Sequence, residues 1–348
     1  MSGFTFGLAI LGALVLAAVV GWNAWSTRRL APRQAALAER VEPGEAAAPA
    51  PEPLEPVFDD REEAPLSLPV PVPERKPGLD ALIDAIAPIA IDAPVPGEAA
   101  LAALPGTRRA GSKPFAIEGL NEATQQWETP QAGQRYTAFQ AGVQLANRTG
   151  ALNEIEFSEF VVKAQAFADA VNGAPEFPEM RHEVARAREL DQFAGGHDAQ
   201  LGFTLRARQA AWSPGYLHQH AARFGFVTGA IPGRMVLPAV QAGHPPLLVL
   251  AFDSQAAMAE DPEQTAIREA TLSLDVPQVP RHEQPFARMR DAAMGLSASL
   301  DGVITDDNGR EIRPEALDVV GADLELLYDT LESRDLAAGS PQARRLFG

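Results

Sequence analysis

The most constraining feature of this sequence is an uninterrupted apolar stretch near its start, from Phe4 to Trp22. It consists of the letters FTFGLAILGALVLAAVVGW, and none of these side chains carries a charge. A helix rises about 1.5 Å per residue, so this stretch is long enough to span the roughly 30 Å hydrocarbon core of a bilayer. The sequence therefore predicts a transmembrane helix over residues 4–25, with Trp22 and Trp25 at the interface.

The charges on either side of the stretch predict its orientation. Residues 1–3 carry no basic side chain, whereas Arg28, Arg29 and Arg33 follow the apolar run. Basic residues collect on the cytoplasmic side of a span, so residues 1–3 are expected outside and the rest of the chain inside. The alternative is a cleaved signal peptide, which needs a basic segment before the apolar run. That segment is missing, and a retained anchor is the better interpretation.

Charge and composition exclude several functional classes. The net charge is −17, whereas a nucleic-acid partner requires a basic stripe. The chain has no cysteine, which excludes thiolate chemistry. The six histidines are scattered, the pair Asp306-Asp307 lies in an expected turn, and no nucleotide, phosphate or zinc motif occurs. The sequence therefore predicts a non-enzymatic protein with no metal, no cofactor and no small-molecule substrate.

Proline dominates the region after the apolar stretch. Half of the 30 prolines fall before residue 108, mixed with Ala and Glu. Such a composition buries too little apolar surface to offset the entropy of ordering, and dense proline favours an extended spacer. Residues 26–107 are therefore predicted to form a disordered Pro/Ala/Glu-rich linker. Within it, Leu79 to Ile91 has helical apolar spacing, typical either of a transient helix or of a short docking motif.

A folded part is predicted from Arg108, because strand and helix patterns alternate there. The alternation in 198–206 and 270–276 is typical of strands, the 3–4 spacing in 157–171 and 286–300 is typical of helices, and Ser213-Pro214 is a good helix start. Further strands are expected at 113–120, 136–145, 226–237 and 247–252, further helices at 179–193 and 314–331, and a hairpin at Asn308-Gly309. The tail 338–348 is expected to fray.

The folded part contains a weak internal repeat. Residues 142–173 and 271–302 align without a gap, each as strand, loop, helix and glycine. Repeated strand–helix–strand order with alternating strands predicts an α+β fold. We expect split β-α-β repeats in a mostly antiparallel sheet, with the helices on one face.

Several runs in the C-terminal part carry a family resemblance. They are LSLDVPQV, the helix containing Phe286, DGVITDDNGR and the helix opening at Pro314, preceded by DAQLGFTLRA and SPGYLHQHAARFGF. In this order they resemble the FtsZ-binding domain of the ZipA family of bacterial cell-division proteins, over roughly residues 198–332. The layout of one span, a Pro/Ala/Glu linker and an α+β domain resembles the same family. Residues 108–197 lie outside the resemblance and are either an α+β extension or a second copy of the unit.

The resemblance implies a partner and a binding face. Members of the family tether the tubulin-like FtsZ ring to the inner membrane, and the sheet face turned away from the helices takes up the helical C-terminal peptide of FtsZ. The positions that match this face include polar residues, which implies weaker binding because less apolar area is buried. The implied partner-binding residues are Ile231, Phe252, Gln200, Thr204, Ser273 and Arg310.

The resemblance also implies a location. Residues 1–3 are expected in the periplasm, residues 4–25 in the bilayer of the cell inner membrane, and a ZipA-like FtsZ-binding domain over 198–337 in the cytoplasm at mid-cell. Two alternatives stay open. The domain could be a membrane-anchored adaptor for another division or envelope partner, with weak or no direct FtsZ binding. It could also be periplasmic, if the span runs in the opposite sense.

Overall fold

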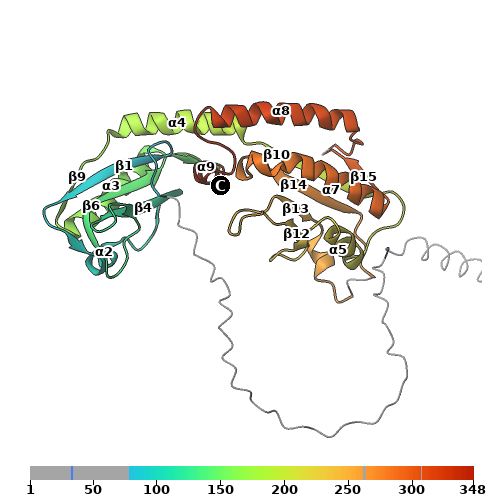
Figure 1. The fold of residues 1–348 in the computed structure, drawn as a ribbon, viewed down its shortest axis with the longest axis horizontal. Coiled ribbons are helices and arrows are strands. Elements are labelled where there is room, and N and C mark those ends of the chain that lie inside the picture. Colours follow the sequence, from blue (N-terminus) through green and yellow to red (C-terminus); the bar gives the residue numbers. More distant parts are fainter. Residues whose placement is uncertain (1–32, 34–77, 262–263, 307) are drawn as a thin grey trace, which may run out of the picture.

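The computed structural model describes residue 33 and residues 78–261, 264–306 and 308–348. The expected span over residues 4–25 and the linker residues 34–77 lie outside the described residues. No helix in the part that the structure describes has the length and apolarity needed to cross a membrane. The described chain forms two α+β units that lie side by side (Figure 1).

The first unit is a sheet in the order β3-β4-β6-β1-β9, with β2 and β5 paired at its margins. A separate small hairpin, β7-β8, follows β6. Helices α2 and α3 belong to this unit, and α4 leads out of it. The elements are β1 (Asp84–Ile91), β2 (Val95–Pro96), α2 (Gly97–Ala103), β3 (Arg109–Ala110), β4 (Lys113–Asn121), β5 (Trp127–Glu128), β6 (Arg135–Gln144), β7 (Ala146–Asn147), β8 (Gly150–Ala151), α3 (Glu154–Ala170), β9 (Gly173–Pro175) and α4 (Met180–His197).

The second unit is a six-stranded sheet in the order β11-β12-β13-β14-β10-β15. Helices α5 and α7 pack over the core, α8 packs on α7, and the chain ends in the short helix α9. The elements are β10 (Gln200–Ala207), α5 (Pro214–Ala222), β11 (Val227–Thr228), β12 (Arg234–Leu237), β13 (Leu248–Ala251), α6 (Ser254–Ala257), β14 (Glu269–Asp275), the 3-10 turns η2 (Val276–Gln278) and η3 (Arg281–Glu283), α7 (Pro285–Leu300), β15 (Gly302–Thr305), α8 (Pro314–Glu332) and α9 (Pro341–Leu346).

The two units share one topology. In the first, β1 lies between β6 and β9, and α3 connects β6 to β9. In the second, β10 lies between β14 and β15, and α7 connects β14 to β15. All of these ladders are antiparallel. The expected α+β class with antiparallel sheets is confirmed, and the strand order agrees with a second copy of the unit rather than with an unrelated extension.

The linker prediction is wrong for residues 78–107, which form β1, β2 and α2. Leu79 to Ile91 is not helical, because Asp84–Ile91 is a strand with neighbours on both sides. Pro88 is an unusual residue inside a paired strand, since proline cannot donate to a ladder. It is tolerated because β9 ends beside it: Glu176 donates its N–H to the Pro88 carbonyl at 2.9 Å, and no reciprocal bond is needed.

Each unit has its own core. In the first, Phe139 of β6 packs edge-on against Phe167 of α3, and the ring of Phe115 on β4 lies 6.1 Å from that of Phe160 on α3, so α3 is fixed on the sheet by aromatic contacts. In the second, the fully buried Trp212 lies among aliphatic residues of the strands and of α7, and donates its indole N–H to the Leu300 carbonyl at 2.8 Å. Each sheet is therefore covered by helices on one face and leaves the other face free of them.

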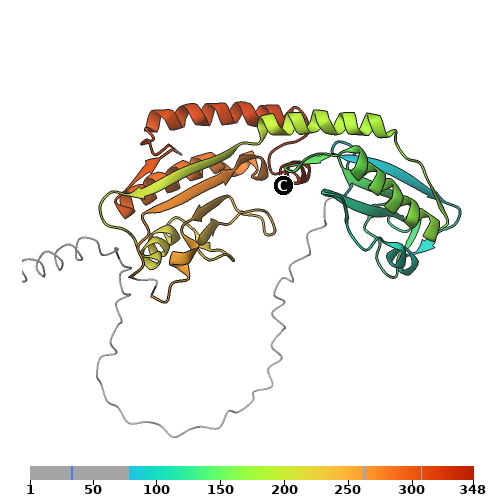
Figure 2. The same cartoon turned by 180° about the vertical axis from the view of Figure 1, so that it is seen from behind.

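Two helices join the units. The helix expected at 179–193 is longer than predicted, because α4 continues through Gly195 and Gly196 to His197. It buries Ala187 in the first core and Ala194 in the second, and it lies end to end with α8 (Figures 1 and 2). The tail 338–348 does not fray either. Its helix α9 lies between the units and buries Phe347 completely.

Candidate partner-binding surface

The sheet of the second unit has a face that its helices do not cover. Along β10, Phe203 and Leu205 are buried in the core that α5 and α7 share, so Gln200, Gly202 and Thr204 point to the opposite side. Along β14, the side chains of Ala270, Leu272 and Leu274 are buried and those of the residues between them are not. We call the side away from the helices the outer face.

The outer face has a polar half and an aliphatic half. Cross-strand pairing places Gly202 opposite Ser273 and Thr204 opposite Thr271, which makes the half over β10 and β14 small and polar. Further along, Val249 is opposite both Ser273 and Val236. Val236, Val249 and Ala251 are partly exposed and point to the same side, so the half over β12 and β13 is mainly aliphatic. The exposed Arg234, opposite Ala251, lies at its margin.

Three of the predicted residues, Gln200, Thr204 and Ser273, share this face. Ser273 lies at the boundary of the two halves and donates its hydroxyl to the Val249 carbonyl at 3.4 Å. Thr204 accepts the hydroxyl of Thr305 at its carbonyl at 3.3 Å, which ties β10 to the edge strand β15. The outer face therefore brings together the residues that alternation predicted on the first and last strands of the resemblance.

Gln200 lies at one end of the face, beside an ion-pair network between the units. Arg148, from the β7-β8 hairpin, donates to the Asp198 carboxylate at 2.6 and 2.8 Å and to the Asp275 carboxylate at 2.7 and 2.8 Å. The hydrogen bonds that Arg148 donates, first to Asp198 and then to Asp275, raise the pKa of Arg148. With the Gln200 amide turned toward it, Arg148 also donates to the amide oxygen at 3.0 Å. The network closes this end of the face with one guanidinium held between two carboxylates.

The other three predicted residues lie elsewhere. Phe252 is on the opposite side, 9% exposed, with its ring 5.6 Å from that of His218 on α5, so its assignment to the partner surface is wrong. Ile231 is 54% exposed in the turn between β11 and β12, beyond the aliphatic half. Arg310 lies in the hairpin after β15, where its backbone N–H donates to Asp306 at 2.8 Å.

Glycine at position 233 has a steric reason. Its φ is +75°, and a Cβ there would come within 2.6 Å of the Phe252 carbonyl oxygen. The turn between β11 and β12 therefore requires a residue without a side chain. Ile231, two residues earlier, supplies the exposed apolar side chain of this turn.

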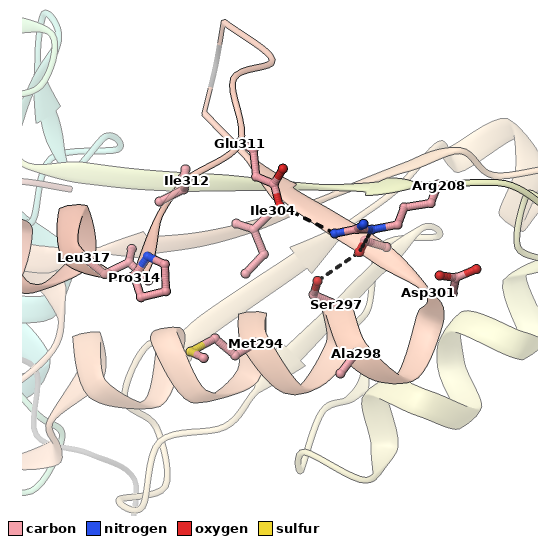
Figure 3. Close-up of a pocket in the computed structure, with 11 residues that line it drawn as sticks. Arg208, Met294, Ser297, Ala298, Asp301, Ile304, Glu311, Ile312, Pro314 and Leu317 are labelled. Atoms are coloured by element: carbon pink, nitrogen blue, oxygen red, sulfur yellow. Dashed lines mark hydrogen bonds and ion pairs between the residues drawn. The ribbon is translucent and has the colours of Figure 1, made fainter.

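A cavity of about 420 Å³ lies on the helix side of β15, away from the outer face (Figure 3). Met294 of α7 and Ile304 of β15 face each other across it, and the start of α8 closes one end. At the other end, Arg208 donates to the Gly302 carbonyl at 3.1 Å and lies 3.5 Å from the Glu311 carboxylate. Arg208 and Glu311 therefore neutralise each other at this end of the cavity. The described lining residues contain no nucleophile-and-base arrangement.

Within the described residues, no group of His, Asp and Glu side chains has an arrangement that could hold a metal ion. His220 is 9% exposed, and burial lowers its pKa. His218 contacts the ring of Phe252 and its pKa is also lowered by burial. Both histidines are explained by packing against the core, so the outer face is the best candidate for a functional surface.

Comparison with protein families identifies one part of this unit. A family described as ZipA, C-terminal FtsZ-binding domain, matches residues 251–322. The match runs from the end of β13 through β14, α7 and β15 into α8, so it contains the polar half of the outer face on β14. A comparison with curated proteins finds no match. Residues 251–322 are therefore similar to the FtsZ-binding domain of the ZipA family.

Proposed function

We propose that this protein is a non-enzymatic tether of the bacterial division ring that binds the C-terminal peptide of FtsZ on the outer face of its second unit. The family match supports an FtsZ-binding role in cell division. The observation that carries the choice of surface is the aliphatic half of the outer face, where Val236, Val249 and Ala251 are partly exposed on a side without helices.

The chemistry of the face suits an amphipathic helix. Val236 and Val249 are directly paired, so their side chains form one continuous apolar strip across β12 and β13. Gly202 and Ser273 beside the strip are small enough for a helix to approach the sheet closely. Such a helix would place its apolar residues on the strip and its polar residues over Thr204 and Thr271.

The test is a titration of the full-length chain, in detergent, with the FtsZ C-terminal peptide. Val249→Asp places a charge in the middle of the strip and should weaken binding at least about tenfold, since burying an unpaired carboxylate is costly. Val319→Asp on α8 is the matched control, because Val319 is 62% exposed and far from the face in sequence and structure. It should bind like the unchanged chain.

The polar half of the outer face determines how strongly we expect the FtsZ peptide to bind. Gln200, Ser273 and Thr204 bury less apolar area than aliphatic residues would, so we expect weak, micromolar or weaker, binding. Absence of binding at millimolar peptide would overturn the FtsZ assignment and favour the alternative of an adaptor for another division or envelope partner.

The tether part of the proposal rests on the sequence of residues 4–25 and the basic residues after it. We infer a single-pass anchor in the cell inner membrane, with residues 1–3 in the periplasm and both α+β units in the cytoplasm at mid-cell. A fluorescent reporter fused after Gly348 should therefore fluoresce only when it stays in the cytoplasm. Activity of a reporter that works only in the periplasm would contradict this orientation.

A further inference from the structure

The free edge of β4 in the first unit is interrupted by a gap between its two short neighbours. Strand β3 pairs with β4 at Lys113 and Pro114, and β5 pairs with it at Gly119 and Leu120. Phe115 donates its N–H toward this edge, to the Arg108 carbonyl at 3.0 Å. Backbone groups alternate along a strand, so the N–H and C=O of Ile117 also point to this edge, between the two neighbours.

The gap opens into an apolar groove of about 480 Å³. Helix α2 forms one wall and β4 the other, and Leu101 of α2 is 40% exposed there. Among the described residues, no backbone group pairs with Ile117 on this side. The groove therefore combines an unpaired strand edge with apolar walls. Its apolar lining includes Leu101, Leu104, Pro105, Pro114, Phe115 and Ile117.

The chain itself arrives at this groove. Gly78 packs against Glu118, which lines the groove, and Leu79 donates its N–H to the Glu118 carboxylate at 3.0 Å. Leu79 then covers Gly142 on β6, and the chain enters β1, the next strand. It thus crosses the sheet starting from the β4 side. Gly78, where this described part of the chain begins, therefore lies beside Glu118, a residue of the groove.

The sequence before Gly78 has a pattern that fits one side of a strand edge. Residues 65–73 are PLSLPVPVP, in which proline or serine alternates with leucine or valine. The leucines and valines all have the same parity, so their N–H groups face one way and their side chains share one face. The prolines have the opposite parity, where a strand paired on one side needs no donor.

We propose that residues 65–73 of this chain occupy the groove beside β4 as a short extended segment paired to Ile117. Only five peptide steps separate Pro73 from Gly78, a reach of at most about 17 Å. This short connection gives the segment a millimolar or higher effective concentration at the groove. The apolar side chains of Leu68 and Val70 would meet α2.

Hydrogen–deuterium exchange of residues 115–119, in the full-length chain in detergent, tests the pairing. Leu68→Asp with Val70→Asp places charges on the face toward α2 and should speed exchange at Ile117 at least about tenfold. Ser67→Asp with Pro71→Asp adds the same charge on the opposite face and should leave exchange unchanged. Equal effects of the two double variants, or no effect of either, would overturn the proposal.

Disulfide cross-linking gives an independent readout, because the chain has no cysteine of its own. Val70→Cys with Leu104→Cys, the latter in the groove, should cross-link readily under mild oxidation. Val70→Cys with Val319→Cys is the control, since Val319 is exposed on α8 of the second unit. Equal cross-linking of the two pairs would mean that the segment does not occupy the groove, which would then be open to a partner.

Discussion

At the residue scale, the fold most clearly changes the ionisation of Tyr328 on α8. It is 3% exposed, and its hydroxyl has no hydrogen-bond partner in the described part of the chain. The guanidinium of Arg281 lies 5.7 Å from the centre of its ring. Burial raises the pKa of Tyr328 to about 12, and the nearby Glu325 adds to this effect.

Tyr328→Phe should therefore leave stability at pH 7 unchanged or slightly higher, because it removes a buried hydroxyl without a partner. Between pH 10 and 12 an unfolded tyrosine loses its proton while Tyr328 keeps it, so the unchanged protein loses stability as the pH rises. The Tyr328→Phe variant should keep up to about 2 kcal/mol of the stability that the unchanged protein loses over this pH range. Urea unfolding at pH 8, 10 and 11 measures it, and parallel pH profiles would contradict the role of Tyr328.

The residues of the outer face show what alternation can and cannot predict. Gln200, Thr204 and Ser273 lie where their strands predicted, because each strand alternates apolar and polar letters. Phe252 was assigned to the wrong side, since a shift of one residue moves a side chain to the opposite face. Val249 was missed because the run Leu247 to Ala251 is apolar at every position, which hides the alternation.

At the scale of elements, the sequence predicted the helices and strands that have local signals, such as a helix cap or alternating apolar residues. Helix α5 begins at Pro214 after Ser213, whose hydroxyl accepts the Tyr216 N–H at 3.1 Å. The predicted strands became β4, β6, β10, β13 and β14 with small shifts. Strand β1 and helix α9 were missed because long-range packing, rather than local pattern, orders them. Their Ala- and Pro-rich letters resemble those of a linker.

The capping box of α3 supports an element-scale prediction. Asn153 accepts the N–H groups of Ile155 and Glu156 at 3.0 Å, and Glu156 accepts the Asn153 N–H at 3.2 Å. Asn153→Ala should lower the free energy of unfolding by about 1 kcal/mol, whereas Asn153→Asp keeps the acceptor and should cost little. Thermal unfolding of both variants checks this. Equal losses would show that the side-chain oxygen is not what matters.

At the scale of the whole molecule, α9 joins the end of the chain to the start of the first unit. Arg345 forms an ion pair with Asp84, which is 1% exposed, and donates to the Gly78 carbonyl at 3.2 Å. Gln342 donates to Asp80 at 2.8 Å, and Gln144 donates to the Arg345 carbonyl at 2.8 Å. The last helix therefore holds the two units together through the face of the first sheet that its helices leave free.

Arg345→Met should destabilise the protein by about 3 kcal/mol at pH 7, because it leaves the Asp84 carboxylate buried without its cation. Burial already raises the pKa of Asp84, and Arg345 opposes that rise. The neutral carboxyl is then the form that the fold favours, so the loss should shrink as the pH falls toward about 4. Arg344→Met is the matched control and should change denaturant unfolding little. A loss that does not depend on pH would contradict the assignment.

The contacts of Arg33 bear on the path of the chain from the proposed membrane anchor. Arg33 is held against the second unit: its N–H donates to the Ala211 carbonyl at 2.6 Å, its carbonyl accepts the Ser213 N–H at 2.8 Å, and its guanidinium pairs with Asp301 at 2.7 Å. If the span ends at residue 25, eight peptide steps reach Arg33, at most about 29 Å. The proline-rich residues then connect Arg33 to Gly78 instead of spacing the domain from the bilayer.

This path predicts that the second unit stays near the bilayer whatever the length of the proline-rich segment. Energy transfer from a dye on Val319→Cys to labelled lipid measures the distance in vesicles. Deletion of residues 40–60 should leave the transfer unchanged, because the segment does not set the distance. Arg33→Pro removes both the N–H donor and the ion pair with Asp301, so the transfer should fall. If instead the deletion raises the transfer and Arg33→Pro has no effect, the segment is a spacer after all and Arg33 does not dock the domain.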